Sequence, residues 1–461
     1  MNIYIEVEVT QRELSGRLLI ALELIKYGHQ VYIADRGTIN QLALKKKIQP
    51  GIIFLKDMNA STLRISEYKK LIKNKFRLVS QDEECGTFKE SSFKYFYRDR
   101  FQGSKSFKYI DKYFCWGELD YDFLKKINTK IKFCKTGSPR MDIAINKKLN
   151  KNTNFKKKNK LKDKVILISL NHNLFWKRDF IERLTIDTFE LKKDSIDDRI
   201  KIAYENESND YILFLYLFQL IVKLDELNNF SIVVRPHPAM DRKKCELVFN
   251  SYKYFKNLRI ITGSDLIDQI NYSNYIISTG CTSGVEATLS NKNVITFLPN
   301  KKNLKEYKKD IFLNTIGKKF DDVSKIFKYI KKNSSSKFKQ KKQIEEDKNR
   351  INKRALIDKI SFKRIADEIN SIKMKNFENS DEKFLYKHGY FSLIKKNIKK
   401  ILIDKKLIKK DLNVFEMKFP PFEEKFITEE LDNLKKSFNI NCKYNLKILN
   451  DRCLKLYQDK D

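Results

Sequence analysis

Residues 274–298 have the sequence NYIISTGCTSGVEATLSNKNVITFL, in which two strand patterns enclose one helix pattern. The β-branched, apolar runs at 274–279 and 293–298 each predict a buried strand. Between them, a loop of small hydroxyl residues leads into a helix. A strand, a helix and a second strand in this order are typical of a βαβ unit, so the stretch predicts a parallel sheet.

The same alternation continues in both directions along the chain. Further strand patterns, with helical patterns between most of them, lie at 3–9, 30–34, 51–55, 76–80, 112–117, 130–137, 165–170, 231–236 and 259–262. Strands that alternate with helices build parallel sheets covered by helices. We therefore predict an α/β fold with two Rossmann-like α/β domains facing a central cleft, with ligands bound at the strand ends.

Changes in composition divide the chain into four parts. We predict one Rossmann-like domain at 1–150 and a second at 165–335, joined by a polar, basic linker at 151–164. Residues 336–461 are rich in lysine and have helical patterns, so they predict a helical C-terminal extension. Within it, KKNIKKILIDKKLIKK (395–410) either lies on an anionic membrane surface or packs its apolar stripe on the protein.

The chain is strongly basic. Among 461 residues, 95 are Lys or Arg and 59 are Asp or Glu, which gives a formal charge of +36. Such a surface attracts nucleic acid, anionic lipid or phosphate-bearing substrates, although a lysine-rich composition alone would also produce it. A nucleic-acid-binding protein is therefore one alternative. Against it, the lysines are spread along the whole chain, and there is no finger, helix-turn-helix or RNA-binding aromatic signature.

The cysteine, histidine and N-terminal patterns exclude several classes. Seven scattered cysteines without a CxxC pair argue against a disulfide framework and a zinc ribbon, and four histidines leave little for a metal site. We expect no metal and no cofactor. No window offers eighteen uninterrupted apolar residues. The start, MNIYIEVEVTQREL, carries acids where a secretion signal needs a basic region, so we expect a cytoplasmic protein.

The strongest candidate for binding is Arg235-Pro236-His237-Pro238, directly after the strand pattern SIVV. The two prolines stiffen the turn and hold His237 at the strand end. A guanidinium and an imidazole at this place can both reach phosphate oxygens.

A second candidate is the loop Ser278-Thr279-Gly280-Cys281-Thr282-Ser283, which leads into a helix. Backbone N–H groups and the helix dipole at such a start favour an anion, and Thr282 and Ser283 add hydroxyl donors. An ordinary N-cap would need only one of these residues. Glu286, in the first turn, could accept bonds from a ribose or simply complement the dipole.

A third candidate is Asp82-Glu83-Glu84, which follows the strand pattern FRLVS and precedes Cys85-Gly86. Acids at a strand end are candidates for a general base, although acid runs are also common in solvated loops. Weaker signals are Arg140, in the turn Gly137-Ser138-Pro139-Arg140, and Asn171, after the first strand of the second domain. Both could line the cleft, and both could equally be turn residues.

Together these motifs resemble the bacterial surface-polysaccharide glycosyltransferases of the GT-B fold that use CMP-activated sugars, such as capsule-type sialyltransferases and Kdo transferases. That group carries two acids followed by glycine, an HP dipeptide and a later Ser/Thr pair. The counterparts here, in order, are 82–86, His237-Pro238 and Thr282-Ser283. The opening YIEVEVTQREL and the later TGSPRMD resemble a narrower set of surface carbohydrate biosynthesis proteins.

The resemblance implies a GT-B-like enzyme with an acceptor domain at 1–150 and a donor domain at 165–335. The donor would be a CMP-linked 2-keto sugar acid, bound through His237, Thr282 and Ser283 with Arg235 beside them. The acceptor would be a glycan or a glycolipid, reached through peripheral contact with the anionic inner membrane face. Displacement would invert the anomeric centre without a metal.

The same resemblance implies that an acid of the first domain takes the acceptor proton. Cys85 interrupts the motif of two acids followed by glycine, so the choice stays open among Glu83, which we favour, Asp82 and Glu84. Two rivals keep the fold: a CDP-glycerol-type polyol-phosphate transferase and a UDP-sugar 2-epimerase. The first typically uses a second histidine as base, for which the two domains offer only His29 and His172.

Overall fold

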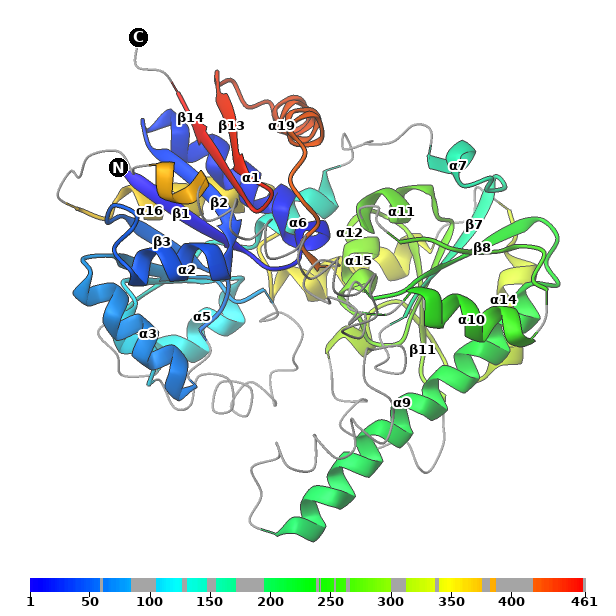
Figure 1. Cartoon of the computed structure of the whole chain (residues 1–461). Coiled ribbons are helices and arrows are strands. Elements are labelled where there is room, and N and C mark those ends of the chain that lie inside the picture. Colours follow the sequence, from blue (N-terminus) through cyan, green and yellow to red (C-terminus); the bar gives the residue numbers. More distant parts are fainter. Residues whose placement is uncertain are drawn as a thin grey trace, which may run out of the picture. The chain divides into compact units, whose positions relative to one another are not determined.

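The computed structural model comprises two compact units (Figure 1). The first unit is Met1–Leu149 with Arg350–Asp461, and the second is Asn150–Asn349. The structure describes residues 1–58, 61–83, 105–126, 131–146, 155–170, 195–237, 240, 242–252, 254–262, 266–299, 312–335, 340–374, 382–386 and 418–458.

The first unit is built on an eight-stranded sheet with the order β13-β14-β2-β1-β3-β4-β5-β6. Its strands are β1 (Asn2–Val7), β2 (Gln30–Asp35), β3 (Ile52–Leu55), β4 (Arg77–Ser80), β5 (Lys112–Cys115), β6 (Lys132–Lys135), β13 (Asn445–Asn450) and β14 (Cys453–Tyr457). β1 to β6 are parallel. All six residues of β1 are buried, as expected for a parallel sheet with helices on both faces.

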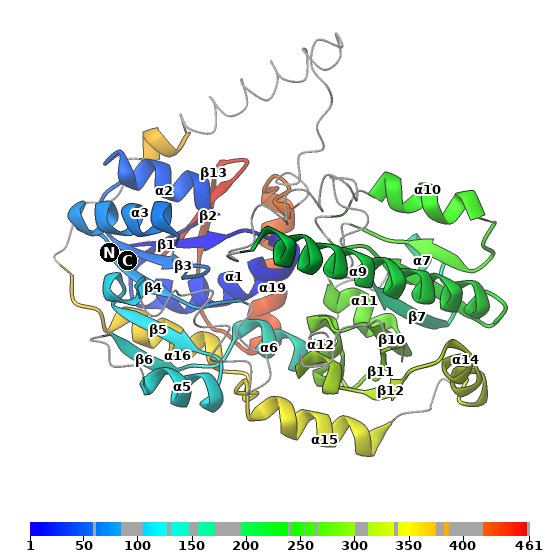
Figure 2. The same ribbon diagram turned by 90° about the horizontal axis from the view of Figure 1, so that it is seen from below.

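Helices cover both faces of this sheet (Figure 2). They are α1 (Thr10–Lys26), α2 (Arg36–Leu44), α3 (Thr62–Lys73), the short 3-10 helix η3 (Phe107–Tyr109), α5 (Glu118–Lys125), α6 (Pro139–Ile145), α16 (Ser361–Asn370) and α19 (Glu424–Phe438). α1 packs against α6, α16 and α19, whereas α2 and α3 pack together on the opposite face. Gly16 allows the contact between α1 and α6, because a Cβ there would lie 3.3 Å from Pro139 Cβ.

The C-terminal part of the chain belongs to the first unit. β14 pairs antiparallel with β2, with Leu454 opposite Ile33, and β13 pairs with β14. Without this hairpin, β2 would be an open sheet edge. The sequence-based expectation of a helical extension at 336–461 is therefore wrong for 445–457. The reason is a period-two pattern in NLKILN and CLKLY, which the high lysine content hides.

The second unit has a six-stranded parallel sheet with the order β12-β11-β10-β7-β8-β9. Its strands are β7 (Lys164–Ser169), β8 (Phe230–Arg235), β9 (Leu258–Ile260), β10 (Tyr275–Ser278), β11 (Asn293–Phe297) and β12 (Lys318–Phe320). β7, β8 and β9 follow one another toward one edge of the sheet, and β10, β11 and β12 follow one another toward the other edge, which is the Rossmann strand order. The predicted α/β class with two Rossmann-like units is confirmed, while the GT-B-like arrangement with a cleft between them stays a prediction.

The helices of the second unit bury its apolar strands. They are α7 (Phe155–Lys158), α9 (Ile196–Leu224), α10 (Arg242–Tyr252), α11 (Leu266–Tyr272), α12 (Thr282–Leu289), the 3-10 helix η5 (Phe312–Thr315), α14 (Val323–Lys332) and most of α15 (Lys341–Asn352), whose residues from Arg350 on belong to the first unit. Leu217 and Ile221 of α9 join Ile166 and Ile232 of the sheet in one core. Part of the predicted linker also packs here, since Phe155 stacks on Tyr272 with ring centroids 5.5 Å apart.

Some predicted features lie outside the described residues: Glu84, Asn171, Pro238 and the basic segment 395–410. The predicted membrane contact of that segment therefore stays a prediction. Among the helices that the structure describes, none combines the length and the hydropathy needed to cross a bilayer.

The hairpin at the C-terminus should contribute to the stability of the first unit. Leu454 is fully buried between β13 and β2, so Leu454→Ala should lower the free energy of unfolding by about 3 kcal/mol. Leu63→Ala, at a position on α3 that is 70% exposed, is the matched control and should change it by less than about 0.5 kcal/mol. Denaturant titration measures both, and equal effects would show that the hairpin is dispensable.

Candidate functional site

Each sheet has a switch point where successive connections run to opposite sides, and ligands of open α/β folds bind there, beyond the carboxyl ends of the strands. In the first unit the switch lies between β1 and β3, and in the second it lies between β7 and β10. Polar residues gather at both places.

In the second unit, the loop after β10 forms a tight turn into α12. Gly280 has a φ of +88°, and a Cβ at this position would lie 2.5 Å from the side-chain oxygen of Asn314, so only glycine fits. The Cys281 N–H donates to Ser278 Oγ over 3.2 Å, and α12 begins at Thr282 without a side-chain cap on its first turn. This start of α12 is suited to an anion.

Two hydroxyls beside this switch point are available to a ligand. Thr279 Oγ1 and Ser169 Oγ are buried, and neither has a hydrogen-bond partner among the described residues. Buried polar atoms normally have partners, so such atoms at a strand end indicate a place for a ligand or for water.

On the other side of β7, the strand β8 ends with Arg235. Its backbone carbonyl accepts the Leu170 N–H over 2.9 Å, which fixes the ends of β7 and β8 to each other. Arg235 is 9% exposed, and His237 is half-buried. A turn fixes His237, because the Met240 N–H donates to its carbonyl over 2.8 Å.

The structure thus brings most predicted donor residues to one switch point. Arg235 ends β8 and His237 follows it. Ser278 ends β10, and Thr279, Gly280, Thr282 and Ser283 follow it, with β7 between the two strands. Glu286 lies one turn into α12 and is 4% exposed. Arg140 belongs to the first unit, in α6, where it is 8% exposed.

In the first unit, the acids after β4 are buried. Glu83 Oε1 lies 2.9 Å from Arg17 Nη2, and both side chains are almost inaccessible. The Arg17 guanidinium also lies over the Phe54 ring, 4.2 Å from its centroid. Asp82 is fully buried, and its carbonyl accepts from Trp116 Nε1 over 2.8 Å. Glu83, the favoured base, is therefore an ion-pair partner inside the fold.

A neighbouring acid, Glu13 of α1, shares this environment. It accepts the Glu8 N–H over 2.8 Å and Arg12 Nη2 over 2.9 Å. Burial raises the pKa of Glu13, the charge of Glu83 raises it further, and Arg12 and Arg17 oppose the shift.

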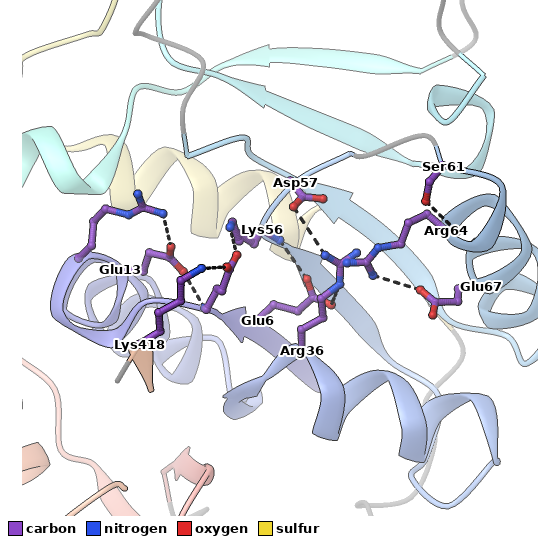
Figure 3. Close-up of polar contacts among 11 residues, drawn as sticks. Glu6, Glu13, Arg36, Lys56, Asp57, Ser61, Arg64, Glu67 and Lys418 are labelled. Carbon is purple, nitrogen blue, oxygen red and sulfur yellow. Dashed lines mark hydrogen bonds and ion pairs between the residues drawn. The ribbon is translucent and has the colours of Figure 1, made fainter. Parts of the chain in front are cut away.

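Charged residues that the sequence did not single out lie at the switch point between β1 and β3 (Figure 3). Glu6 Oε2 accepts the Lys56 N–H over 3.2 Å, and its other oxygen lies 3.9 Å from Arg36 Nε. Arg36 Nη1 lies 3.6 Å from Asp57. Burial raises the pKa of Glu6 to about 7, although Arg36 acts in the opposite direction.

Glu8, two residues after Glu6, is the most exposed acid of this group. It forms ion pairs with Lys56, from the end of β3, and with Lys418, whose Nζ lies 2.9 Å from Glu8 Oε1. The sequence IYIEVEV contains a signal for Glu6 and Glu8. A strand that is buried on both faces should carry an acid only where that acid has a partner or a function, because burying an unpaired charge is costly.

Among the described residues, no group of three or more His, Cys, Asp or Glu side chains is arranged to hold a metal ion. The predicted independence from metals stays a prediction.

No family model matches the chain, and no curated protein matches it. Solved structures do. A putative UDP-N-acetylglucosamine 2-epimerase from Listeria monocytogenes has 11% identity and a TM-score of 0.46, with 80% of this chain and 96% of that chain covered. UDP-GlcNAc 2-epimerase from Methanocaldococcus jannaschii, in complex with UDP-GlcNAc and UDP, has 13% identity and a TM-score of 0.47, with 80% of this chain and 99% of that chain covered.

The wall teichoic acid polymerase TagF has 11% identity and a TM-score of 0.48, with 80% of this chain and 87% of that chain covered. Such low identities and TM-scores carry no statement about the activity of this chain.

Loss of the buried Arg17 should destabilise the first unit. Arg17→Met leaves the Glu83 carboxylate without its cation, so we expect a loss of about 3–5 kcal/mol in the free energy of unfolding. Arg64→Met removes the more exposed pair of Arg64 with Glu67 on α3 and should cost only about 0.3–0.5 kcal/mol. Urea titration compares the two variants, and a similar small loss in both would contradict the structural role of Arg17.

Glu6 should make stability depend on pH. Its folded pKa of about 7 exceeds the ordinary value of 4.5, so the folded state holds a proton that the unfolded state releases. Wild-type stability should therefore fall relative to Glu6→Gln as pH rises from 4.5 to 7, by up to about 3 kcal/mol. Unfolding curves at several pH values measure the difference, and a constant difference would contradict the raised pKa.

Proposed function

We propose that the protein is a nucleotide-sugar-dependent glycosyltransferase of bacterial surface polysaccharide biosynthesis. The donor is a CMP-linked 2-keto sugar acid, and the acceptor is a hydroxyl of a glycan or glycolipid. This proposal rests on the residues at the switch point of the second unit. There, the start of α12 and the buried Thr279 hydroxyl lie on one side of β7, the buried Ser169 hydroxyl lies at the end of β7 itself, and Arg235 lies on the other side.

This arrangement suits the leaving group of the reaction. When the bond between the anomeric carbon and the phosphate oxygen breaks, negative charge grows on the phosphate of CMP. Backbone N–H groups at the start of α12, together with Arg235 and His237, can donate to that phosphate and stabilise the transition state. Thr279 and Ser169 can donate hydroxyl hydrogens to the donor's phosphate or carboxylate.

A melting experiment with CMP, CDP, UDP, UMP and GDP tests the proposal. A nucleotide at about 100 times its Kd adds roughly 2.7 kcal/mol of stability, which raises Tm measurably. CMP should stabilise the wild type selectively. The effect should fall in His237→Ala and in Thr279→Val, which removes a hydroxyl without changing the side-chain shape.

Thr288→Val is the matched control, because the Thr288 hydroxyl donates to Gly284 O within α12 over 3.0 Å. It should change the starting Tm but leave the CMP-induced shift intact. Selective stabilisation by CDP would indicate polyol-phosphate transfer instead, and selective stabilisation by UDP would indicate a sugar 2-epimerase. Silence across the panel would refute the donor site.

A further inference from the structure

The acids at the carboxyl edge of the first unit's sheet differ sharply in accessibility. The side chains of Glu6 and Glu13 are 1% and 0% exposed, and that of Glu83 is 6% exposed. The Glu8 side chain is 34% exposed. A general base must come within hydrogen-bond distance of the hydroxyl that it deprotonates. Of these four acids, only Glu8 can meet a substrate without rearrangement of the fold.

We propose that Glu8 is the catalytic base of this enzyme, and that Lys418 of the C-terminal segment positions it. This inference rests on the proposed glycosyltransferase function. Glu8 takes the role that the sequence-based expectation gave to Glu83, because Glu83 is buried in an ion pair with Arg17. Glu8 directly follows β1 and lies at the switch point between β1 and β3, where an open α/β sheet binds ligands.

Three contacts fix the Glu8 carboxylate and backbone. Lys56, which follows β3 and is 9% exposed, pairs with Oε2, and Lys418 Nζ pairs with Oε1 over 2.9 Å. The Glu8 N–H donates to Glu13, which itself binds Arg12. Two ammonium groups on two oxygens orient the carboxylate and still leave a third of the side chain accessible.

Lys418 reaches this site because the C-terminal segment is anchored at Lys418 itself and at the residues directly after it. Its carbonyl accepts the Thr10 hydroxyl over 3.3 Å, at the start of α1. Phe419 is buried and packs on Phe422, with ring centroids 5.0 Å apart. The Phe422 N–H donates to Asp451 O, in the turn between β13 and β14. The hairpin on β2 therefore fixes the lysine at the end of β1.

With Glu8 as the base, the transfer is a single displacement step. The acceptor oxygen forms a bond to the anomeric carbon while its proton passes to the Glu8 carboxylate. The bond from the anomeric carbon to the CMP phosphate breaks, and CMP leaves with the electron pair. Lys56 and Lys418 hold the carboxylate in place before the transfer.

Turnover of CMP-N-acetylneuraminate and CMP-Kdo, with water as the acceptor, tests the role of Glu8. CMP release above the rate without enzyme is the readout. Glu8→Gln should lower kcat by about 100-fold or more, the usual contribution of a general base. It should keep the CMP-induced rise in Tm, because the second unit is unchanged. Glu83→Gln is the matched control: it should lose stability but keep more than a tenth of kcat once folded.

Lys418 is tested by its conservative variant and by pH. Lys418→Met should lower kcat and move the acid limb of the pH–rate profile to higher pH. The reason is that only Lys56 is then left as a cation on the Glu8 carboxylate, while the neighbouring charges of Arg12 and Glu13 are the same in both proteins. Lys418→Arg should restore both. A merely structural lysine would change Tm and leave the pH profile in place.

The outcomes separate this inference from the proposed function. If the wild type binds CMP and consumes donor while Glu8→Gln keeps its turnover, the role of Glu8 is refuted and the glycosyltransferase stands. If the wild type does neither, both fail. Wild-type labelling with a carbodiimide and glycine ethyl ester gives a result without any variant: Glu8 should be labelled before Glu13 and Glu83, with turnover lost in step. Earlier labelling of Glu83 would overturn the assignment.

Discussion

The buried ion pair between Arg17 and Glu83 is the interaction on which the carboxyl edge of the first unit's sheet depends. Burying a carboxylate is costly unless a cation and hydrogen bonds compensate for the lost water. Arg17 satisfies Glu83 and at the same time packs on Phe54, so one side chain joins α1, β3 and the end of β4. With Glu6, Glu13 and Glu83 held inside the fold, Glu8 is the most exposed of these four acids.

The two switch points use different chemistry. In the second unit the site consists of backbone N–H groups, hydroxyls and Arg235, a set that donates hydrogen bonds to an anion. In the first unit it consists of carboxylates balanced by Lys56, Lys418 and arginines, a set that can accept a proton. Under the proposed function, this division corresponds to the two halves of a transfer reaction, in which one group leaves with negative charge and another loses a proton.

The sequence predicted the parts that depend on local patterns. Strand runs with loops of Arg, His, Ser, Thr and Gly predicted that these residues lie at the ends of β8 and β10 and at the start of α12, because such residues mark strand ends and helix starts. It missed Glu6 and Glu8, since acids that alternate with apolar residues also occur on solvated strands. It missed Lys418 entirely. That lysine reaches Glu8 through pairing between β14 and β2, a contact far along the chain that no local pattern encodes.

The pairing of β14 with β2 also affects how the chain is made. Ile33 of β2 can pair with Leu454 of β14 only after Leu454 has been synthesised, which is roughly 20–80 s later at ordinary translation rates. During this interval the ribosome completes the second unit, whose strands are contiguous in sequence, while β2 of the first unit is left as an unpaired edge. Until the last strand emerges, this edge offers unpaired backbone N–H and C=O groups to which a strand of another chain can pair.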